Sequence, residues 1–258
     1  MDLIFYKYHG TGNDFILIDN RTGNFPKADE DLISLLCQRH VGVGADGLIL
    51  LENDPQNDFK MVYYNADGRI GSMCGNGGRC IVAFARKLGL ISEKAKFLAS
   101  DGVHEATIEG DIVNLKMQQV TLIREKPDYI FLNTGSPHHV QLVDDLVSLD
   151  VKTEGKRLRY GLYGEKGSNI NFTELAGHNS FAVRTYERGV ENETLSCGTG
   201  VTAVALGMHH LGHATAEVIR IITKGGDLEV SFGKNAGNYV DIRLKGPVKE
   251  VFKGTITW

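Results

Sequence analysis

Two cysteines stand in matching surroundings, each followed by a glycine-rich run and then by apolar residues at helical spacing. Cys74 opens the run Cys-Gly-Asn-Gly-Gly-Arg, and Cys197 opens Cys-Gly-Thr-Gly. A thiol at the start of a helix lies near the positive end of the helix dipole and near N–H groups that the helix itself does not use. Both features favour the thiolate, the reactive form of cysteine. Each run therefore offers an acid–base group beside N–H groups that can bind a carboxylate.

Two thiols on opposite sides of one bound amino acid would suit the inversion of its stereocentre. Removing the α-proton from one face and returning a proton to the other requires two acid–base groups. Without a cofactor, N–H groups gathered on the α-carboxylate would have to stabilise the carbanion electrostatically. The sequence predicts that Cys74 and Cys197 are the catalytic pair of such a cofactor-independent reaction.

Other cysteine chemistry fits the spacing less well. A zinc site would use closely spaced ligands such as C-x₂-C, but Cys74 and Cys80 are too far apart and Cys197 has no cysteine near it in the sequence. A redox dithiol would need C-x-x-C, which the chain lacks. We therefore predict no metal site. Cys80 and Cys37, which falls on the apolar side of its expected helix, are predicted to be buried apolar residues.

The elements that position the cysteines are repeated along the chain. The two cysteines are 123 positions apart, and so are Gly89 and Gly212, which end the two apolar runs. Thr11-Gly12 recurs at the same offset as Thr134-Gly135. This shared offset predicts an internal duplication. We expect an α/β (α+β) fold of two similar, pseudo-symmetric domains, each a curled, mostly antiparallel sheet or barrel around a central helix.

The same offset indicates where the chain divides. We predict an N-terminal domain of residues 1–118 plus 247–258, which carries Cys74, and a C-terminal domain of residues 119–246, which carries Cys197. A second, short helix is expected from Asp29 to Arg39 because leucines and isoleucine recur there at helical spacing. The glycine-rich stretch 42–47 lacks a nucleotide-binding pattern and is predicted to be a tight turn. Short strands are predicted at 3–8, 15–18, 48–51, 59–64, within 96–117, and at 130–133, 140–143, 168–175, 180–187, 217–223, 228–232 and 239–244.

Composition narrows the class of protein and its partners. With 258 residues, 42% of them hydrophobic, each half is long enough to enclose its own core. A formal charge of −4 and the lack of any basic cluster give no reason to expect nucleic acid as a partner. No apolar run approaches the ~20 residues of a membrane span. Four cysteines without a dense framework, and an N-terminus that reads as a strand, favour the cytoplasm.

Several motifs together closely resemble those of the diaminopimelate epimerase family, and the resemblance extends over nearly the whole chain. The combination of Cys-Gly-Asn-Gly-x-Arg with Glu-Arg-Gly and Cys-Gly-Thr-Gly is highly specific. The segments that carry the resemblance are Gly10-Thr11-Gly12-Asn13-Asp14-Phe15, Tyr64-Asn65-Ala66-Asp67-Gly68, Met73-Cys74-Gly75-Asn76-Gly77-Gly78-Arg79, Asn169-Ile170-Asn171-Phe172, Glu187-Arg188-Gly189 and Cys197-Gly198-Thr199-Gly200.

The resemblance implies an isomerase that interconverts LL- and meso-2,6-diaminopimelate for lysine and cell-wall synthesis, without pyridoxal phosphate or any other cofactor. It implies a small-molecule substrate in a cleft between the two domains, and a homodimer. Cys74 and Cys197 would be the acid–base pair. The other site residues that it implies are the backbone N–H groups of Gly75, Asn76, Gly198 and Thr199 on the reacting carboxylate, Glu187 on the reacting amino group, Asn13, Asn65, Asn169 and Arg188 at the distal end, and His138 in support.

Two positions depart from the pattern of the family. Ser136 stands where many members have asparagine; its hydroxyl can still bind substrate but is shorter. Gly47 stands where many members carry a larger polar side chain. Neither position touches the cysteines in sequence, so the expected reaction type is unchanged while details of the pocket are open.

Three alternatives stay open on the sequence alone. A proline or hydroxyproline racemase would use the same two cysteines, but its substrate has no second carboxylate for Arg188 to bind. A non-catalytic binding protein of the same fold would not need both cysteines. A disulfide between Cys74 and Cys197 could regulate the enzyme by oxidation. The sequence also leaves open which cysteine is the thiolate before substrate binds.

Overall fold

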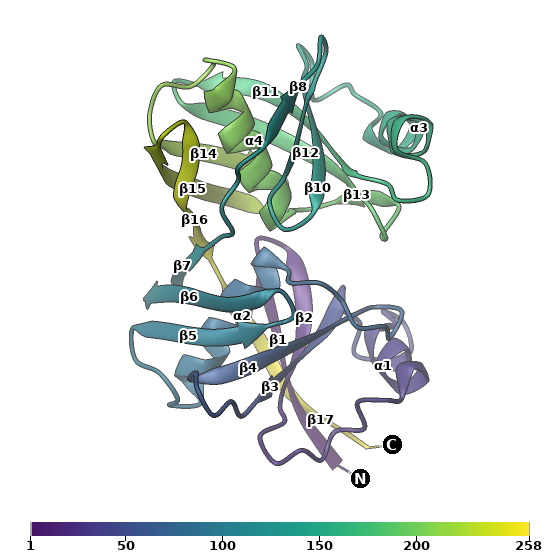
Figure 1. The fold of residues 1–258 in the computed structure, drawn as a ribbon. Coiled ribbons are helices and arrows are strands. Elements are labelled where there is room, and N and C mark those ends of the chain that lie inside the picture. The colour runs from purple at the N-terminus through teal and green to yellow at the C-terminus, as the bar shows by residue number, and fades with distance from the viewer. Residues whose placement is uncertain (1, 258) are drawn as a thin grey trace. The chain divides into compact units, whose positions relative to one another are not determined.

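The computed structural model describes every residue except the first and the last, and the chain divides into two compact units. Unit 1 takes the described residues up to Leu115 and from Gly246 onward, and unit 2 takes Lys116–Lys245. Each unit is a curled sheet with one long helix packed on its inner face and a second helix on its outer face (Figure 1). No helix in the described part of the chain is long and apolar enough to cross a membrane.

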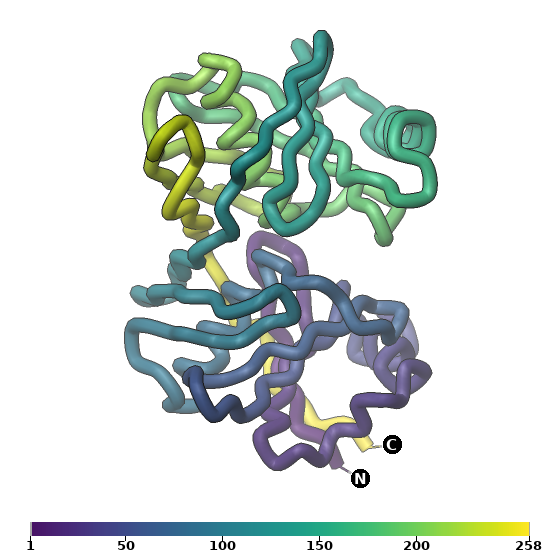
Figure 2. The backbone as a smooth tube through the Cα atoms, in the orientation of Figure 1, coloured from purple at the N-terminus to yellow at the C-terminus, as the bar shows by residue number. Residues whose placement is uncertain are grey.

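The sheet of unit 1 begins with two strands from opposite ends of the chain. The last strand, β17 (Lys249–Thr257), pairs antiparallel with the first, β1 (Asp2–Gly10), so both ends of the described chain lie side by side (Figure 2). The pairs β2–β3 and β4–β5 are parallel and the other neighbours are antiparallel. The sheet continues through β2 (Asn13–Asp19), β3 (Gly47–Glu52), β4 (Phe59–Asn65), β5 (Lys94–Ala99), β6 (Gly102–Glu109) and β7 (Ile112–Lys116).

Unit 2 repeats this order of strands. Its parallel pairs are β10–β11 and β12–β14, and the other neighbours are again antiparallel. The strands are β8 (Ile123–Glu125), β9 (Ile130–Asn133), β10 (Pro137–Leu142), β11 (Asn169–Gly177), β12 (Ser180–Glu187), β13 (Asn192–Thr194), β14 (Val218–Thr223), β15 (Gly226–Asn235) and β16 (Asn238–Pro247).

The inner helices confirm the predicted duplication. Helix α2 (Gly75–Lys87) and helix α4 (Gly198–His210) have the same length and begin and end 123 positions apart. Each ends at a glycine in the left-handed region, Gly89 with φ 74° and Gly212 with φ 79°, which is a common way to terminate a helix. Helix α4 packs against β9 to β12, β14 and β15 of its own unit. One helix can contact so many strands only because the sheet curls around it.

Strands near the centre of unit 1 are buried on both faces. Ile16 and Ile18 of β2 pack with α1 (Glu30–Cys37) in one cluster, while Phe15 and Leu17 point to the opposite face and are fully buried. A strand covered on both faces carries an apolar side chain at nearly every position. This explains the uninterrupted apolar run Phe15–Ile18 in the sequence.

The outer helix of unit 2, α3 (Val151–Tyr163), was not predicted from the sequence. Its composition is polar and includes Gly155 and Gly161, which lower helix propensity. Gly155 serves close packing, because a Cβ there would lie 2.4 Å from the Cβ of Tyr186 on β12. Asp150 is the N-cap residue of this helix, and its carboxylate accepts a hydrogen bond from the Thr153 N–H at 3.1 Å. The offset of 123 from α1 was the signal that could have located α3.

Candidate active site

Cys74 is the residue that caps the N-terminus of α2. Its backbone is extended (φ −111°, ψ 123°), and its carbonyl oxygen accepts the first helical bond from Gly78 N at 2.7 Å. Glycines let this end of the helix sit close to the sheet: a Cβ on Gly77 would lie 3.0 Å from Ile49 Cδ1 of β3. The half-buried thiol therefore lies beside the first N–H groups of the helix, those of Gly75 and Asn76.

Cys197 occupies the equivalent position at α4. Its backbone is also extended (φ −122°, ψ 110°), and its carbonyl oxygen accepts from Val201 N at 2.8 Å. The thiol is 7% exposed and is followed by Gly198 and Thr199 in the first turn. A Cβ on Gly200 would lie 2.4 Å from Asn171 Oδ1 of β11, so this glycine also serves close packing. Both cysteines thus meet the geometric conditions that favour reactivity.

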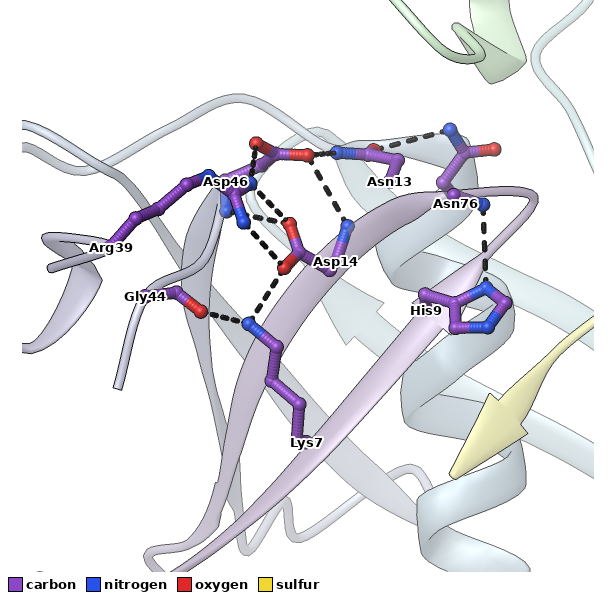
Figure 3. Close-up of polar contacts among 9 residues, drawn as sticks. Lys7, His9, Asn13, Asp14, Arg39, Gly44, Asp46 and Asn76 are labelled. Carbon is purple, nitrogen blue, oxygen red and sulfur yellow. Dashed lines mark hydrogen bonds and ion pairs between the residues drawn. The ribbon is translucent and has the colours of Figure 1, made fainter. Parts of the chain in front are cut away.

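The amide of Asn13 links the Cys74 thiol to Asn76 in the first turn of α2, and Figure 3 shows this amide between Asn76 and Asp46. Its Oδ1 lies 3.7 Å from the Cys74 Sγ and accepts a hydrogen bond from Asn76 Nδ2 at 3.1 Å. Its Nδ2 donates to Asp46 Oδ2 at 2.7 Å. Asn13 follows the β1–β2 turn, where Thr11 (φ 50°) and Gly12 (φ 83°) reverse the chain. The structure therefore brings together three of the predicted site residues of unit 1.

Charged residues surround this amide on two sides. Arg79 is fully buried in α2 and donates to Asn76 Oδ1 at 2.6 Å; burial lowers the pKa of its guanidinium to about 10. On the other side, Arg39 contacts Asp14 at 2.7 Å and Asp46 at 2.6 Å. The buried Lys7 amino group lies 2.7 Å from Asp14 (Figure 3).

Asn65 lies at the end of β4, where it is exposed, and pairs in register with Gly47 of β3. The neighbouring Tyr63 ring fills the space beside Gly47: a Cβ at this position would lie 2.5 Å from Tyr63 Cε2 and 2.6 Å from the Tyr64 carbonyl oxygen. A glycine at position 47 is therefore required by packing against Tyr63.

The thiol of Cys197 has a hydroxyl neighbour. Its Sγ lies 3.5 Å from Thr199 Oγ1, and either atom could donate. The carbonyl oxygen of Thr199 in turn accepts from Thr134 Oγ1 at 2.8 Å. Ser136, which follows the left-handed Gly135 (φ 108°), is half-buried at the start of β10.

His138 is fully buried on β10 and its tautomer is set by Asn171. The Asn171 amide is fixed because Nδ2 donates to the His139 carbonyl at 2.8 Å while Oδ1 accepts from Thr185 at 3.0 Å. Nδ2 also lies 3.1 Å from His138 Nδ1, so this nitrogen accepts and Nε2 carries the proton. Burial lowers the pKa of His138 to about 3, and the ring is neutral. Its buried Nε2–H has no partner among the described residues.

The remaining predicted residues of unit 2 meet where β11 begins and β12 ends. Asn169 Oδ1 accepts from the backbone N–H of Arg188 at 2.8 Å. The exposed guanidinium of Arg188 donates to the Lys166 carbonyl at 2.9 Å. Glu187 accepts from Thr194 Oγ1 at 3.0 Å. An exposed guanidinium can bind a carboxylate through two parallel hydrogen bonds.

The other two cysteines are buried in apolar surroundings, and the sequence had predicted them to be core residues. Burial raises the pKa of the Cys37 thiol to about 12 and raises that of Cys80 as well. These thiols are protonated near neutral pH and hence poor nucleophiles. No group of three or more potential metal ligands occurs among the residues with described coordinates.

Sequence reasoning assigned no role to Asp46 or Asn171, which orient Asn13 and His138 respectively. Asp46 lies in the glycine-rich turn 42–47, whose pattern indicates only a change of direction. Asn171 was part of the motif Asn-Ile-Asn-Phe, and its position two residues after Asn169 was the available signal. In a strand such a spacing places both side chains on one face.

Comparison with known proteins agrees with the motifs. A family model described as diaminopimelate epimerase matches residues 5–123 and 130–250. A diaminopimelate epimerase of Flavobacterium psychrophilum is 57% identical over 97% of this chain and 99% of that protein. A diaminopimelate epimerase of Chlorobaculum tepidum is 43% identical over 96% of this chain and 99% of that protein.

Solved structures share the fold at low identity. A PhzF-family phenazine biosynthesis protein of Bacillus anthracis has a TM-score of 0.79 at 13% identity and covers 100% of both chains. A probable proline racemase of Agrobacterium radiobacter K84 has a TM-score of 0.72 at 14% identity, over 99% of this chain and 93% of that chain. This likeness establishes the fold alone. Both matched segments of the family model, and relatives of high identity over almost the full length, show that the chain belongs to the diaminopimelate epimerase family.

Proposed function

We propose that this protein interconverts LL-2,6-diaminopimelate and meso-2,6-diaminopimelate without a cofactor, using Cys74 and Cys197 as the two acid–base groups. The observation that carries the proposal is the pair of thiols that cap two equivalent helices, α2 and α4. Membership in the diaminopimelate epimerase family supports the choice of substrate. The fold alone would not, because a probable proline racemase shares it.

In the proposed reaction, one cysteine is a thiolate and the other a thiol. The thiolate removes the α-proton from one face of the substrate, and the thiol gives its proton to the opposite face. The reverse reaction exchanges the two roles. Backbone N–H groups of Gly75, Asn76, Gly198 and Thr199 would bind the α-carboxylate, where negative charge increases in the transition state.

Polar side chains would hold the rest of the substrate. Glu187 would bind the reacting ammonium group, and Arg188 would bind the distal carboxylate through its planar fork. We assign His138 the role of a hydrogen-bond donor to the substrate. Its buried Nε2–H has no partner among the described residues, and a buried donor left without a hydrogen bond destabilises the protein by about 1–3 kcal/mol. The other proposed substrate-binding side chains are Asn13, Asn65, Ser136 and Asn169.

The proposed biological setting follows from the family. An epimerase of this specificity supplies meso-diaminopimelate for lysine and peptidoglycan precursors, and we place it in the cytoplasm as a homodimer. Sedimentation velocity on the purified protein tests the assembly: a single species of twice the 28.3 kDa chain mass is expected, and a monomer at assay concentration would contradict the dimer.

The substrate assignment is tested by incubating the enzyme separately with LL-diaminopimelate, L-proline and trans-4-hydroxy-L-proline, followed by chiral chromatography. We expect conversion of LL-diaminopimelate to the meso form and no inversion of the two cyclic amino acids. Inversion of proline without inversion of diaminopimelate would refute the substrate assignment while leaving the two-cysteine chemistry in place. No inversion of any of the three would count against the activity itself.

A further inference from the structure

Arg159 is a buried arginine in the last turns of α3, the helix that packs on β11, β12 and β13 at the outer face of the unit 2 sheet (Figure 1). Only 8% of its side chain is exposed, although arginine usually lies at the surface of a protein. Burying a guanidinium is costly unless its N–H groups find partners. The partners of Arg159 therefore indicate what this side chain does in the fold.

The guanidinium of Arg159 holds the segment 164–167, which follows α3. Its Nη1 donates to the Gly164 carbonyl, and its Nη2 lies 3.5 Å from the Glu165 carbonyl oxygen. Gly167 is in the left-handed region with φ 62°, and a Cβ there would lie 2.5 Å from Arg159 Cζ. Glycine at this position lets the chain pass directly against the guanidinium, so the segment is fixed by both hydrogen bonds and packing.

The same guanidinium holds the turn 187–191 at the end of β12. Its Nε donates to Glu191 Oε1 at 3.1 Å, and this oxygen also accepts from the Gly189 N–H at 3.1 Å. The other carboxylate oxygen of Glu191 accepts from the Tyr186 hydroxyl at 3.1 Å. Glu191 has φ 55°, which residues other than glycine adopt rarely. Such a strained backbone persists only where the surrounding contacts fix it, and here they include Arg159.

Arg188 joins the two segments that Arg159 holds. It lies in the turn 187–191, and its Nη1 donates to the Lys166 carbonyl of the segment 164–167 at 2.9 Å. A guanidinium has five N–H donors, so this bond leaves others for a carboxylate. The carbonyl that orients the guanidinium of Arg188 is thus placed by the segment that is fixed to Arg159.

We propose that Arg159 is a positioning residue for the distal end of the substrate site, because it fixes the segment 164–167 and, through Glu191, the turn 187–191. The guanidinium of Arg188 is then oriented before substrate binds. This inference rests on the proposed function, in which Arg188 binds the distal carboxylate. An oriented guanidinium binds more tightly, since immobilising a long side chain at the moment of binding costs affinity.

Hydrogen exchange tests whether Arg159 holds the two segments, and it needs no substrate. Arg159→Gln keeps a polar side chain but removes the charge and the forked set of donors. We expect the amides of 164–167 and 187–191 to exchange about tenfold faster or more than in wild type, because local opening of these segments becomes easier. Arg157→Gln is the matched control on the same helix, at a side chain that is 66% exposed, and should leave both segments unchanged.

Steady-state kinetics with LL-diaminopimelate test whether Arg159 acts through Arg188. Arg159→Gln should raise KM by about two- to tenfold, the range expected when one more long side chain must be immobilised on binding, with a smaller change in kcat. When Arg159→Gln is added to Arg188→Ala, kcat/KM should stay at the value of Arg188→Ala alone, because no guanidinium remains to be oriented. A merely structural role would lower kcat/KM in both backgrounds.

Glu191 provides a second pair of variants, which decides the matter should Arg159→Gln not fold by circular dichroism. Glu191→Ala removes the carboxylate that joins Arg159 to the Gly189 N–H. It should speed exchange of the turn 187–191 and raise KM in the same way. Glu191→Gln keeps an oxygen that can accept from both partners, so its exchange and its KM should stay closer to those of wild type.

The results separate the positioning role from the proposed function. Unchanged exchange of the turn 187–191 in a folded Arg159→Gln or Glu191→Ala protein would overturn the positioning role, whatever the substrate is. An equal fall in kcat/KM in the wild-type and Arg188→Ala backgrounds would show that Arg159 does not act through Arg188. A wild-type enzyme that does not epimerise LL-diaminopimelate would refute the proposed function, while hydrogen exchange would still decide whether Arg159 holds the two segments.

Discussion

Among single residues, the four cysteines differ in what surrounds the sulfur. Cys37 and Cys80 are buried, and burial raises the pKa of both thiols so that they stay protonated. Cys74 and Cys197 instead each lie at a helix N-terminus. Sequence reasoning predicted these positions at helix N-termini because a cysteine before Gly-x-Gly and an apolar run has a local signature. It reached Asn13 only through the resemblance to a family, since the amide beside Cys74 is contributed by a turn that is distant in the sequence.

Arg188→Lys is predicted to weaken substrate binding. Lysine keeps the charge but cannot form two parallel hydrogen bonds to the distal carboxylate, and losing one charged hydrogen bond costs about 1.5–3 kcal/mol. Steady-state kinetics with LL-diaminopimelate should show KM raised by roughly ten- to a hundredfold, with a smaller change in kcat. The exposed Arg157→Lys on α3 is the control. An unchanged KM in Arg188→Lys would remove this residue from the substrate site.

The buried His138 is predicted to make stability depend on pH. Its pKa is about 3 in the folded protein against 6.5 for an ordinary histidine. Between pH 6.5 and pH 3, therefore, the imidazole is protonated in the unfolded chain but neutral in the folded protein. Stability is therefore complete above pH 6.5 and is lost as the pH falls toward 3, by up to ~1.4 kcal/mol per pH unit.

Urea unfolding of wild type and His138→Gln between pH 7 and pH 4 measures this contribution. The variant should lose less stability on acidification. The slope of its unfolding free energy against pH should be smaller than that of wild type by the equivalent of about one bound proton. The exposed His178→Gln controls for the removal of an imidazole elsewhere in unit 2. Equal slopes for wild type and His138→Gln would show that His138 is not held neutral in the folded protein.

At the scale of elements, helices α2 and α4 position the two cysteines at their N-termini. Glycines in the first turn of each helix allow it to lie close to the strands. The sequence predicted both helices because a strong apolar pattern ended at Gly89 and Gly212. It did not predict α3, whose glycine at position 155 is explained only by the approach of Tyr186. Local patterns locate elements that carry their own signal, while close contacts between distant segments are set by the tertiary fold.

Gly47→Ala is predicted to destabilise the protein. The added Cβ would overlap the Tyr63 ring and the Tyr64 carbonyl oxygen of β4, and overpacking of this kind costs typically about 1–3 kcal/mol. Gly161→Ala in α3 is the matched control, since a Cβ there meets no atom within 4 Å and alanine favours the helix. Urea unfolding should show a loss for Gly47→Ala only; equal stability of Gly47→Ala and wild type would mean that Tyr63 does not fill this space.

On the scale of the whole molecule, duplication explains why one chain carries two cysteines at equivalent helix N-termini. Both units have the same order of parallel and antiparallel strand pairs and the same inner helix. The offset of 123 predicted this from the sequence, because glycines and cysteines at chain reversals keep their spacing after duplication. The residues around each thiol have since diverged: at the offset of 123, Asn76 of unit 1 corresponds to Thr199 of unit 2, and Asn13 corresponds to Ser136.

Inversion in D₂O tests the central claim most directly. Wild type, Cys74→Ala and Cys197→Ala are incubated with LL-diaminopimelate, and the meso product and its α-deuterium are followed by chiral chromatography and mass spectrometry; Cys37→Ala controls for the loss of a thiol. We predict that wild type and the control form α-deuterated meso product, and that each single variant inverts at least about a hundredfold more slowly, as expected for the loss of an acid–base group. Near wild-type inversion by either variant would contradict the two-cysteine account.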